Sequence, residues 1–260
     1  MKTQTLLTTQ RWLVEPEPPQ PDAAVRLICM PYAGAGAVVY RPWRQALPSR
    51  VALSIAQLPG RETRLREDPV RRMELLIEAL TEAVAPLAAR PYALFGHSMG
   101  ALVAFELARA LRRIGVPPPV CLFVSGRRAP QLPETEPHVH QLADGPFVGA
   151  MVRRYNAIPR VILEDIELLR LFLPALRADL EVIETYAYTS EAPLGCPIVA
   201  LGGASDVRAT ADDLEAWRTQ TAAGFEVVQF PGGHFYLQTE RRALIDQIVR
   251  ALGGQQGAER

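Results

Sequence analysis

Ser98 stands at the centre of residues 96–100, Gly-His-Ser-Met-Gly, which form a G-x-S-x-G pattern. The apolar, β-rich residues 92–95 precede this pattern, and a helical pattern over residues 101–114 follows it. A serine flanked by glycines between a strand and a helix is typical of a nucleophile elbow, a turn so sharp that only glycine fits beside it. The free N–H groups at the start of the helix favour a developing oxyanion. The sequence therefore predicts that Ser98 is a catalytic nucleophile.

A serine needs a neighbouring base and an acid that orients the base. His234 lies in a glycine-rich loop directly after a predicted strand over residues 225–230, and Asp206 lies in the loop that follows the apolar residues 198–201. In either loop, a single histidine or aspartate would carry little weight, because both types are common in turns. The chain order Ser98, Asp206, His234 is that of α/β-hydrolases. We therefore predict a triad in which His234 is the general base and Asp206 fixes its tautomer.

Two backbone N–H groups are candidates for the oxyanion hole. In the fold that carries this triad order, one donor belongs to the residue after the nucleophile, here Met99, and the other to a loop after an early strand. Residues 31–37 form such a loop of small residues after the predicted strand 25–30, and we assign the second donor to Ala33. The glycines of this loop do not fit a nucleotide site, because the third glycine of a dinucleotide fingerprint and the Lys-Ser/Thr pair of a P-loop are missing.

The elements that must position these residues follow an alternating pattern. Apolar, β-rich runs predict strands over residues 25–30, 51–58, 92–95, 120–125, 198–201 and 225–230. Amphipathic patterns predict helices over residues 73–87, 101–114, 211–220 and 243–252. Strands separated by helices imply a mostly parallel sheet with helices on both faces, as in the α/β-hydrolase fold. With 260 residues, 48% of them hydrophobic, the chain is expected to form a single domain over residues 1–260.

Residues 130–186 interrupt the alternation, because they contain helical patterns and no convincing strand. Apolar side chains recur at close to helical spacing over residues 163–183, among them Phe172 and Leu176. This insertion precedes the strand that leads to Asp206, so we expect it to lie over the carboxyl edge of the sheet as a helical lid above Ser98. Its apolar underside would suit an acyl chain. The alternative, that the stripe packs only against the body of the domain, stays open.

The charges and the amino-terminal residues exclude several classes of partner and location. The 28 basic and 28 acidic residues give a net charge of +0, so no overall field favours nucleic acid or an anionic membrane. Residues 1–21 contain no apolar run of signal-peptide length, and no segment approaches the length of a transmembrane helix. We therefore expect a cytoplasmic protein that binds neither nucleic acid nor membrane.

The cysteines and the paired histidines are not expected to bind a metal. Cys29, Cys121 and Cys196 lie in or beside predicted strands, where buried free thiols are common. His138 and His140 have no cysteine or acid nearby at ligand spacing, so we expect a solvated loop there. Neither a metal nor a cofactor is required by the predicted chemistry.

Nearly the whole chain resembles the type II thioesterases, the stand-alone α/β-hydrolases that accompany modular polyketide and nonribosomal peptide synthases. The matching segments are residues 30–34, 57–62, 95–100, 196–198, 202–206 and 232–235. Pro-Gly-Arg-Glu at residues 59–62 is the most discriminating, because generic esterases carry the serine motif without it. The chain departs from the family in two places: Ser205 stands where a second acid is frequent, and Ala35 stands where a second consecutive glycine is common. Neither departure removes a catalytic group.

The resemblance implies that the enzyme hydrolyses acyl groups from the phosphopantetheine arm of acyl or peptidyl carrier proteins, which clears stalled or wrongly loaded chains. Almost all its basic residues are arginines, and the pairs at 71–72, 127–128 and 153–154 are available to a phosphate or an acidic carrier protein. An acyltransferase, a general acyl-CoA or ester hydrolase, and a binding protein built on a hydrolase fold remain as alternatives.

Overall fold

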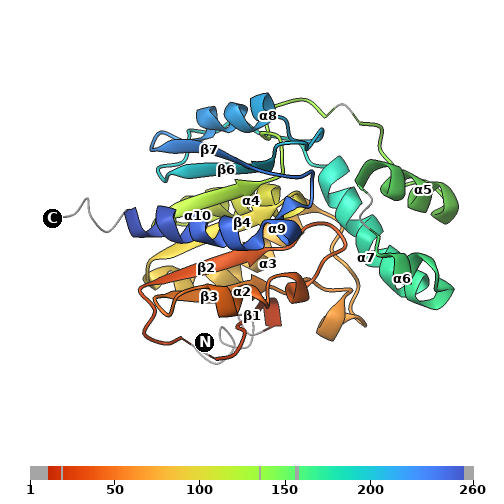
Figure 1. The fold of residues 1–260 in the computed structure, drawn as a ribbon, viewed down its shortest axis with the longest axis horizontal. Coiled ribbons are helices and arrows are strands. Elements are labelled where there is room, and N and C mark those ends of the chain that lie inside the picture. Colours follow the sequence, from red (N-terminus) through yellow and green to blue (C-terminus); the bar gives the residue numbers. More distant parts are fainter. Residues whose placement is uncertain (1–10, 19, 135, 156–157, 255–260) are drawn as a thin grey trace.

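A computed structural model describes residues 11–254 of the chain, apart from residues 19, 135, 156 and 157 (Figure 1). Seven strands form one sheet in the order β1-β3-β2-β4-β5-β6-β7. They are β1 (Leu13–Val14), β2 (Val25–Met30), β3 (Val51–Ala56), β4 (Tyr92–His97), β5 (Cys121–Ser125), β6 (Ile198–Gly203) and β7 (Phe225–Phe230). In this order, each strand from β3 to β7 is parallel to its neighbours within that range, whereas β1 is antiparallel to β3. The prediction of a mostly parallel α/β-hydrolase sheet is confirmed.

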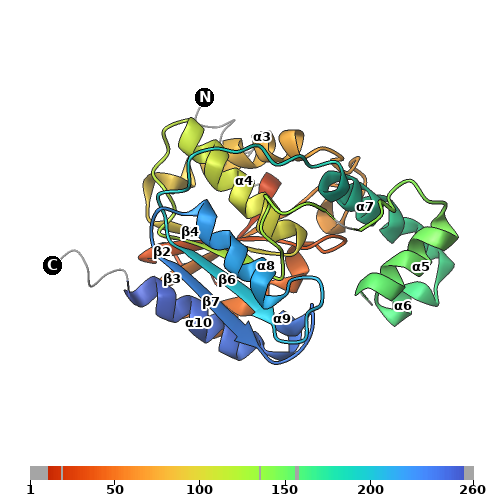
Figure 2. The same cartoon turned by 90° about the horizontal axis from the view of Figure 1, so that it is seen from above.

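Helices cover both faces of the sheet (Figure 2). One face carries α3 (Met73–Val84), α4 (Met99–Arg113) and α8 (Ala211–Glu215), and the other carries α2 (Trp43–Ala46), α9 (Tyr236–Thr239) and α10 (Arg241–Gly254). Short 3₁₀ segments lie at Ala37–Val39, Glu62–Arg64, Leu87–Ala89 and Ala216–Gln220. Apolar side chains alternate between the faces along each strand, so each layer of helices closes its own hydrophobic core.

Between β5 and β6 the chain forms a separate group of helices: α5 (Asp144–Tyr155), α6 (Arg160–Leu163) and α7 (Ile166–Glu184). They lie together to one side of the sheet and share a small core that includes Phe147, Met151 and Leu180 (Figure 1). The Asp165 side chain caps α7 by accepting the N–H groups of Glu167 and Leu168. The helical insertion predicted over residues 130–186 therefore has its own apolar interior.

The structure shifts several predicted boundaries. The strand predicted at 92–95 continues to His97, because Gly96 and His97 still pair with β5. The helix that follows begins at Met99, two residues before its apolar pattern. The predicted helix 211–220 is divided into α8 and a 3₁₀ segment, and β1 was missed because two residues are too short to show alternation. At Gly96, pairing with β5 in the assembled sheet overrides the turn preference of glycine.

All three cysteines are free and buried, as predicted. Within the described part of the chain, every helix is too short or too polar to cross a bilayer. Residues 1–10, part of the segment in which a signal peptide was sought, lie outside the described residues.

Candidate active site

The turn between β4 and α4 has the geometry of a nucleophile elbow. Ser98 adopts φ 54° and ψ −114°, a backbone conformation that non-glycine residues rarely accept. A Cβ atom on Gly96 would lie 1.9 Å from the Gly100 carbonyl oxygen, and one on Gly100 would lie 2.1 Å from the Met30 carbonyl oxygen. Only glycine therefore fits on both sides of Ser98, because the backbone segments touch there.

Asp206 and His234, predicted as acid and base, are in contact. His234 Nδ1 lies 2.8 Å from Asp206 Oδ2, and the Arg208 N–H donates to Asp206 Oδ1 over 2.9 Å. A carboxylate accepts, so the proton of the neutral imidazole sits on Nδ1 and Nε2 is left as the basic nitrogen. His234 Nε2 is buried and has no hydrogen-bond partner among the described residues. The His234 side chain and Ser98 line the same two cavities.

Backbone contacts between two loops set the spacing of Asp206 and His234. The Ala204 N–H donates to the Phe230 carbonyl over 2.8 Å, and the Ser205 N–H donates to the Gly232 carbonyl over 2.9 Å. A Cβ atom on Gly203 would lie 2.3 Å from the Gly233 carbonyl oxygen, so the loops meet without side chains between them. The loops after β6 and β7 therefore form one hydrogen-bonded support for the pair.

His97 is a residue whose role the sequence analysis missed. Its ring is fully buried, and burial, together with the neighbouring charge of His234, lowers its pKa well below the usual value. Nδ1 lies 2.8 Å from Ser125 Oγ, which lies 2.6 Å from the hydroxyl of Tyr236, and the ring centroid is 5.0 Å from that of His234. A neutral His97 thus supports the His234 ring without adding a second positive charge. Its place inside the serine motif was the available signal.

Of the two residues predicted to supply the oxyanion donors, one follows Ser98 in the chain and the other shares a cavity with it. Met99 is the first residue of α4, and Ala33 lines a cavity together with Ser98 and His234. The loop of Ala33 turns through Gly34, whose φ of +77° favours glycine. These positions agree with an oxyanion hole formed by the two amides, whose role stays a prediction.

Two cavities meet at Ser98 and His234. The first is a narrow cavity of about 30 Å³ with mostly apolar walls, to which α7 contributes Phe172 and Leu176. The prediction that the stripe on this helix covers the serine is therefore supported. Leu168 and Leu171 of the same stripe are 41% and 53% exposed and line a separate groove, together with Gly34 and Leu65.

The second cavity, of about 260 Å³, is polar. Three arginines line it, together with the acids with which they form ion pairs: Arg127 with Glu134 (3.6 Å), Arg128 with Asp213 (3.4 Å) and Arg208 with Glu136 (3.6 Å). The Arg208 guanidinium also stacks on the ring of Tyr155, 4.3 Å from its centroid, and Tyr155 lines both cavities. Arg127 and Arg128, one of the three arginine pairs noted in the sequence, line this cavity.

Comparisons with known proteins agree with this geometry. The thioesterase domain family model matches residues 25–254. The chain belongs to the thioesterase family. It is 42% identical over 230 residues to the gramicidin S biosynthesis protein GrsT of Aneurinibacillus migulanus, a match that covers 88% of this chain and 90% of GrsT.

Two solved structures are similar to this thioesterase. The RedJ thioesterase from the prodiginine pathway of Streptomyces coelicolor superposes with a TM-score of 0.82 at 41% identity, covering 88% of this chain and 91% of RedJ. The type II thioesterase BorB from the borrelidin cluster gives a TM-score of 0.84 at 38% identity, covering 93% and 97%. The enzyme is accordingly a hydrolase of thioester bonds, with the type II thioesterases among its near relatives.

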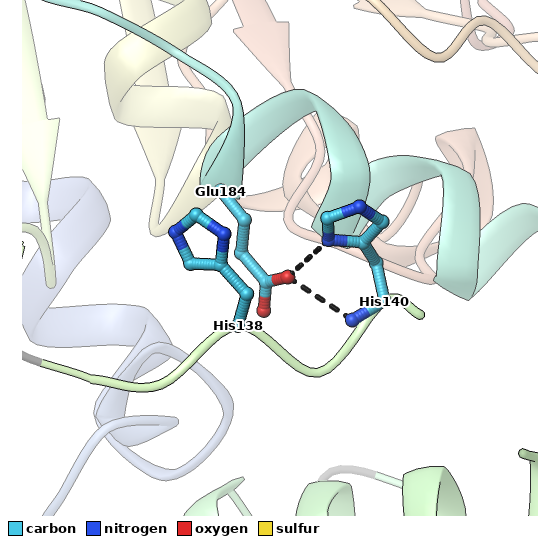
Figure 3. A group of neighbouring side chains, drawn as sticks. All are labelled: His138, His140 and Glu184. Carbon is cyan, nitrogen blue, oxygen red and sulfur yellow. Dashed lines mark hydrogen bonds and ion pairs between the residues drawn. The ribbon is translucent and has the colours of Figure 1, made fainter. Parts of the chain in front are cut away.

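His138 of the thioesterase is exposed, as predicted for a solvated loop, but His140 differs from the prediction. His140 is buried, and its Nδ1 lies 2.5 Å from Glu184 Oε2 at the end of α7 (Figure 3). The Glu184 carboxylate also accepts the backbone N–H groups of Val139 and His140. The prediction of a solvated loop was wrong for His140. Its partner Glu184 lies 44 residues further along the chain, so no local spacing could show the contact.

His138, His140 and Glu184 place one possible metal-ligand atom each within 4.8 Å of the others. The Glu184 oxygens, however, already accept the backbone and ring N–H groups of the neighbouring loop. We therefore interpret the cluster as a hydrogen-bonded anchor between that loop and the end of α7.

Proposed function

We propose that this thioesterase hydrolyses acyl groups carried on the phosphopantetheine arm of acyl or peptidyl carrier proteins. By doing so it would clear stalled or wrongly loaded chains from a polyketide or nonribosomal peptide synthase. The observation that carries the proposal is the meeting of an apolar and a polar cavity at Ser98 and His234. A thioester of this kind joins an apolar acyl chain to a polar arm at the bond to be cleaved. The names of GrsT and RedJ, which place them in gramicidin S and prodiginine biosynthesis, agree with a role in a biosynthetic pathway.

The acyl group would occupy the apolar cavity, and the arm would lie in the polar one. The apolar cavity has room for roughly two water molecules, so a short acyl group fits and a longer one requires Phe172 and Leu176 to move. The polar cavity offers guanidinium groups to the amides, hydroxyl and phosphate of the arm. The lid would therefore select the acyl chain, and the loops of the body would bind the arm.

The chemistry would proceed in two steps. His234 Nε2 takes the proton of Ser98 Oγ as the oxygen attacks the thioester carbonyl, and the same proton passes to the departing pantetheine sulfur. The tetrahedral oxyanion accepts the Met99 and Ala33 N–H groups, while Asp206 stabilises the imidazolium. Water, deprotonated by His234, then attacks the acyl-serine; the bond between the acyl carbon and Ser98 Oγ breaks, His234 returns the proton to Oγ, and the acid is released. These steps require no cofactor.

The proposal is tested by comparing one acyl group on a carrier protein, on coenzyme A and on a truncated pantetheine. We expect kcat/KM to be highest for the carrier protein, because remote binding energy positions the thioester at Ser98. Equal kcat/KM values for the three would remove the carrier protein and leave a general thioesterase. Transfer to an added acceptor thiol in preference to water would indicate an acyltransferase. The cytoplasmic location and the single-domain organisation also stay predictions.

A further inference from the structure

The Pro-Gly-Arg-Glu segment at residues 59–62 reaches the lid through a buried ion pair. Arg61 donates from Nη1 to Asp179 Oδ2 over 2.6 Å and from Nη2 to Asp179 Oδ1 over 2.8 Å. Their side chains are 8% and 3% exposed, and Asp179 belongs to α7 of the lid. The pair is bidentate, the geometry in which a guanidinium and a carboxylate fix each other's orientation most strongly.

The same ion pair holds the loop of the proposed oxyanion donor. Asp179 Oδ2 accepts the Gly34 N–H over 2.7 Å, and Arg61 Nη1 donates to the Ala35 carbonyl over 3.0 Å. Asp179 therefore binds the Gly34 N–H of the loop, and Arg61 binds the carbonyl of the next residue, Ala35. Together they fix the peptide planes that follow Ala33.

The next residue of the segment holds the far end of this loop. Glu62 Oε1 accepts the Val38 N–H over 3.0 Å. A Cβ atom on Gly36 would lie 2.1 Å from that oxygen, so the side chain of Glu62 lies directly against the loop backbone. Glu62 adopts a φ of +49°, a left-handed conformation that non-glycine residues rarely accept. The strain persists because the surrounding contacts hold Glu62 in place.

Asp179 shares one face of α7 with Phe172 and Leu176, since the three are spaced at i, i+4 and i+7. A Cβ atom on Gly34 would lie 2.9 Å from Phe172 Cζ and 3.0 Å from Leu176 Cδ1. The face of the lid helix that lines the acyl cavity therefore also rests on the loop beside Ala33.

A buried ion pair is a poor source of stability, because desolvation offsets much of the attraction between the charges. Positional specificity is the better explanation for this one, because an apolar pair of the same size would leave the Gly34 N–H without its acceptor. A carboxylate at residue 179 satisfies both the guanidinium and the loop amide.

We propose that Arg61 and Asp179 are positioning residues that hold the Ala33 N–H in line with the developing oxyanion and link its placement to the position of the lid. This inference rests on the proposed function, in which Ala33 is an oxyanion donor. In this proposal the Pro-Gly-Arg-Glu segment contributes to turnover through two residues. Arg61 links the position of α7 to the loop of Ala33, and Glu62 fixes the other end of that loop.

The test compares Asp179→Asn with Glu181→Gln. Glu181 lies on the same helix and pairs with Arg71 (2.9 Å), so its variant also removes a carboxylate charge that ties α7 to the body, without touching the loop of Ala33. We would measure kcat, KM and the thermal midpoint on an acyl-pantetheine thioester. We would also measure inhibition by a trifluoromethyl ketone, whose adduct with Ser98 carries an oxyanion.

We expect Asp179→Asn to lower kcat about 10- to 100-fold with KM within about threefold. A displaced Ala33 N–H would stabilise the oxyanion of the transition state less well and would change substrate binding in the ground state little. Affinity for the ketone should fall by a similar factor, and Glu181→Gln should leave both values near wild type. Folded Asp179→Asn with wild-type kcat and ketone affinity would overturn the proposal, as would an equal loss in Glu181→Gln.

Arg61→Lys provides a second variant if Asp179→Asn does not fold. Lysine keeps the charge but cannot make the bidentate contact and reach the Ala35 carbonyl together, so we expect a smaller loss of kcat, of about 3- to 30-fold. Wild-type kcat in Arg61→Lys would contradict a positioning role. Failure of the proposed function looks different: the wild-type enzyme would then show no preference for the carrier-bound acyl group, whereas the effect of Asp179→Asn is read on the small thioester.

Discussion

The two cavities that meet at Ser98 are built from different parts of the molecule. The walls of the polar cavity come largely from loops of the body near the ends of β5, β6 and β7, where Arg127, Arg208 and His234 lie. The apolar cavity takes much of its wall from α5 and α7, which share a separate small core. Under the proposed function, loops of the body would therefore recognise the arm, and helices of the insertion would contact the acyl chain.

The largest effect is expected where the cavities join. Ser98→Ala should lower kcat by on the order of 10⁴-fold or more for every substrate, because serine and histidine act as a unit. The substitution removes one oxygen and should leave both cavities and the thermal midpoint unchanged. Intact-mass measurement of an acyl-loaded carrier protein checks the prediction. Retained turnover would contradict the assignment of Ser98.

Asp206→Asn should rank next, with a loss of about 10³- to 10⁴-fold in kcat, because an amide can stabilise the wrong tautomer of His234. The fold should persist, since the amide oxygen of the introduced asparagine can still accept the Arg208 N–H. Steady-state kinetics on a short acyl thioester would test this, with the exposed Asp212→Asn as the matched control. A near-normal rate in Asp206→Asn would require another acid.

A charge in the apolar cavity should separate substrates by chain length. Phe172→Asp or Leu176→Asp should raise KM for medium-chain acyl groups more than for acetyl, by about fourfold for each methylene that loses its contact, since a buried methylene contributes about 0.8 kcal/mol. Ile166→Asp places the same charge on the 59% exposed outer face of α7 and should have little effect. Equal changes for short and long chains would show that these side chains do not contact the acyl chain.

Removing a charge from the polar cavity should have the smallest effect. Arg127→Ala should lower kcat/KM for the carrier-bound substrate by about 3- to 10-fold at low salt, with a smaller loss at physiological ionic strength, because partly exposed charges are screened. Arg242→Ala, on α10 and 78% exposed, is the control for net charge. An equal loss on a truncated pantetheine thioester would place Arg127 outside recognition of the arm's phosphate.

Several features could be predicted because they are local in the sequence. The elbow around Ser98 needs glycines at fixed positions between a strand and a helix, and the steric contacts of Gly96 and Gly100 confirm that requirement. Asp206 and His234 could be placed because each follows a short apolar strand whose carboxyl end lies at one edge of a parallel sheet. The last residue of β4 and the first residue of α4 could not be predicted, because pairing with β5 decides where the strand stops.

By itself, the sequence determined the alternation of strands and helices, the lid insertion and the order of the triad, since these depend on periodicity and on residues next to one another. Only the tertiary structure decided which side chains meet across long separations. Arg61 contacts Asp179 over 118 residues, and Gly34 contacts Asp179 over 145 residues. The polarity of each cavity was also settled there, because its walls come from separate loops and helices. Such contacts arise from packing in three dimensions, and no local spacing in the chain specifies them.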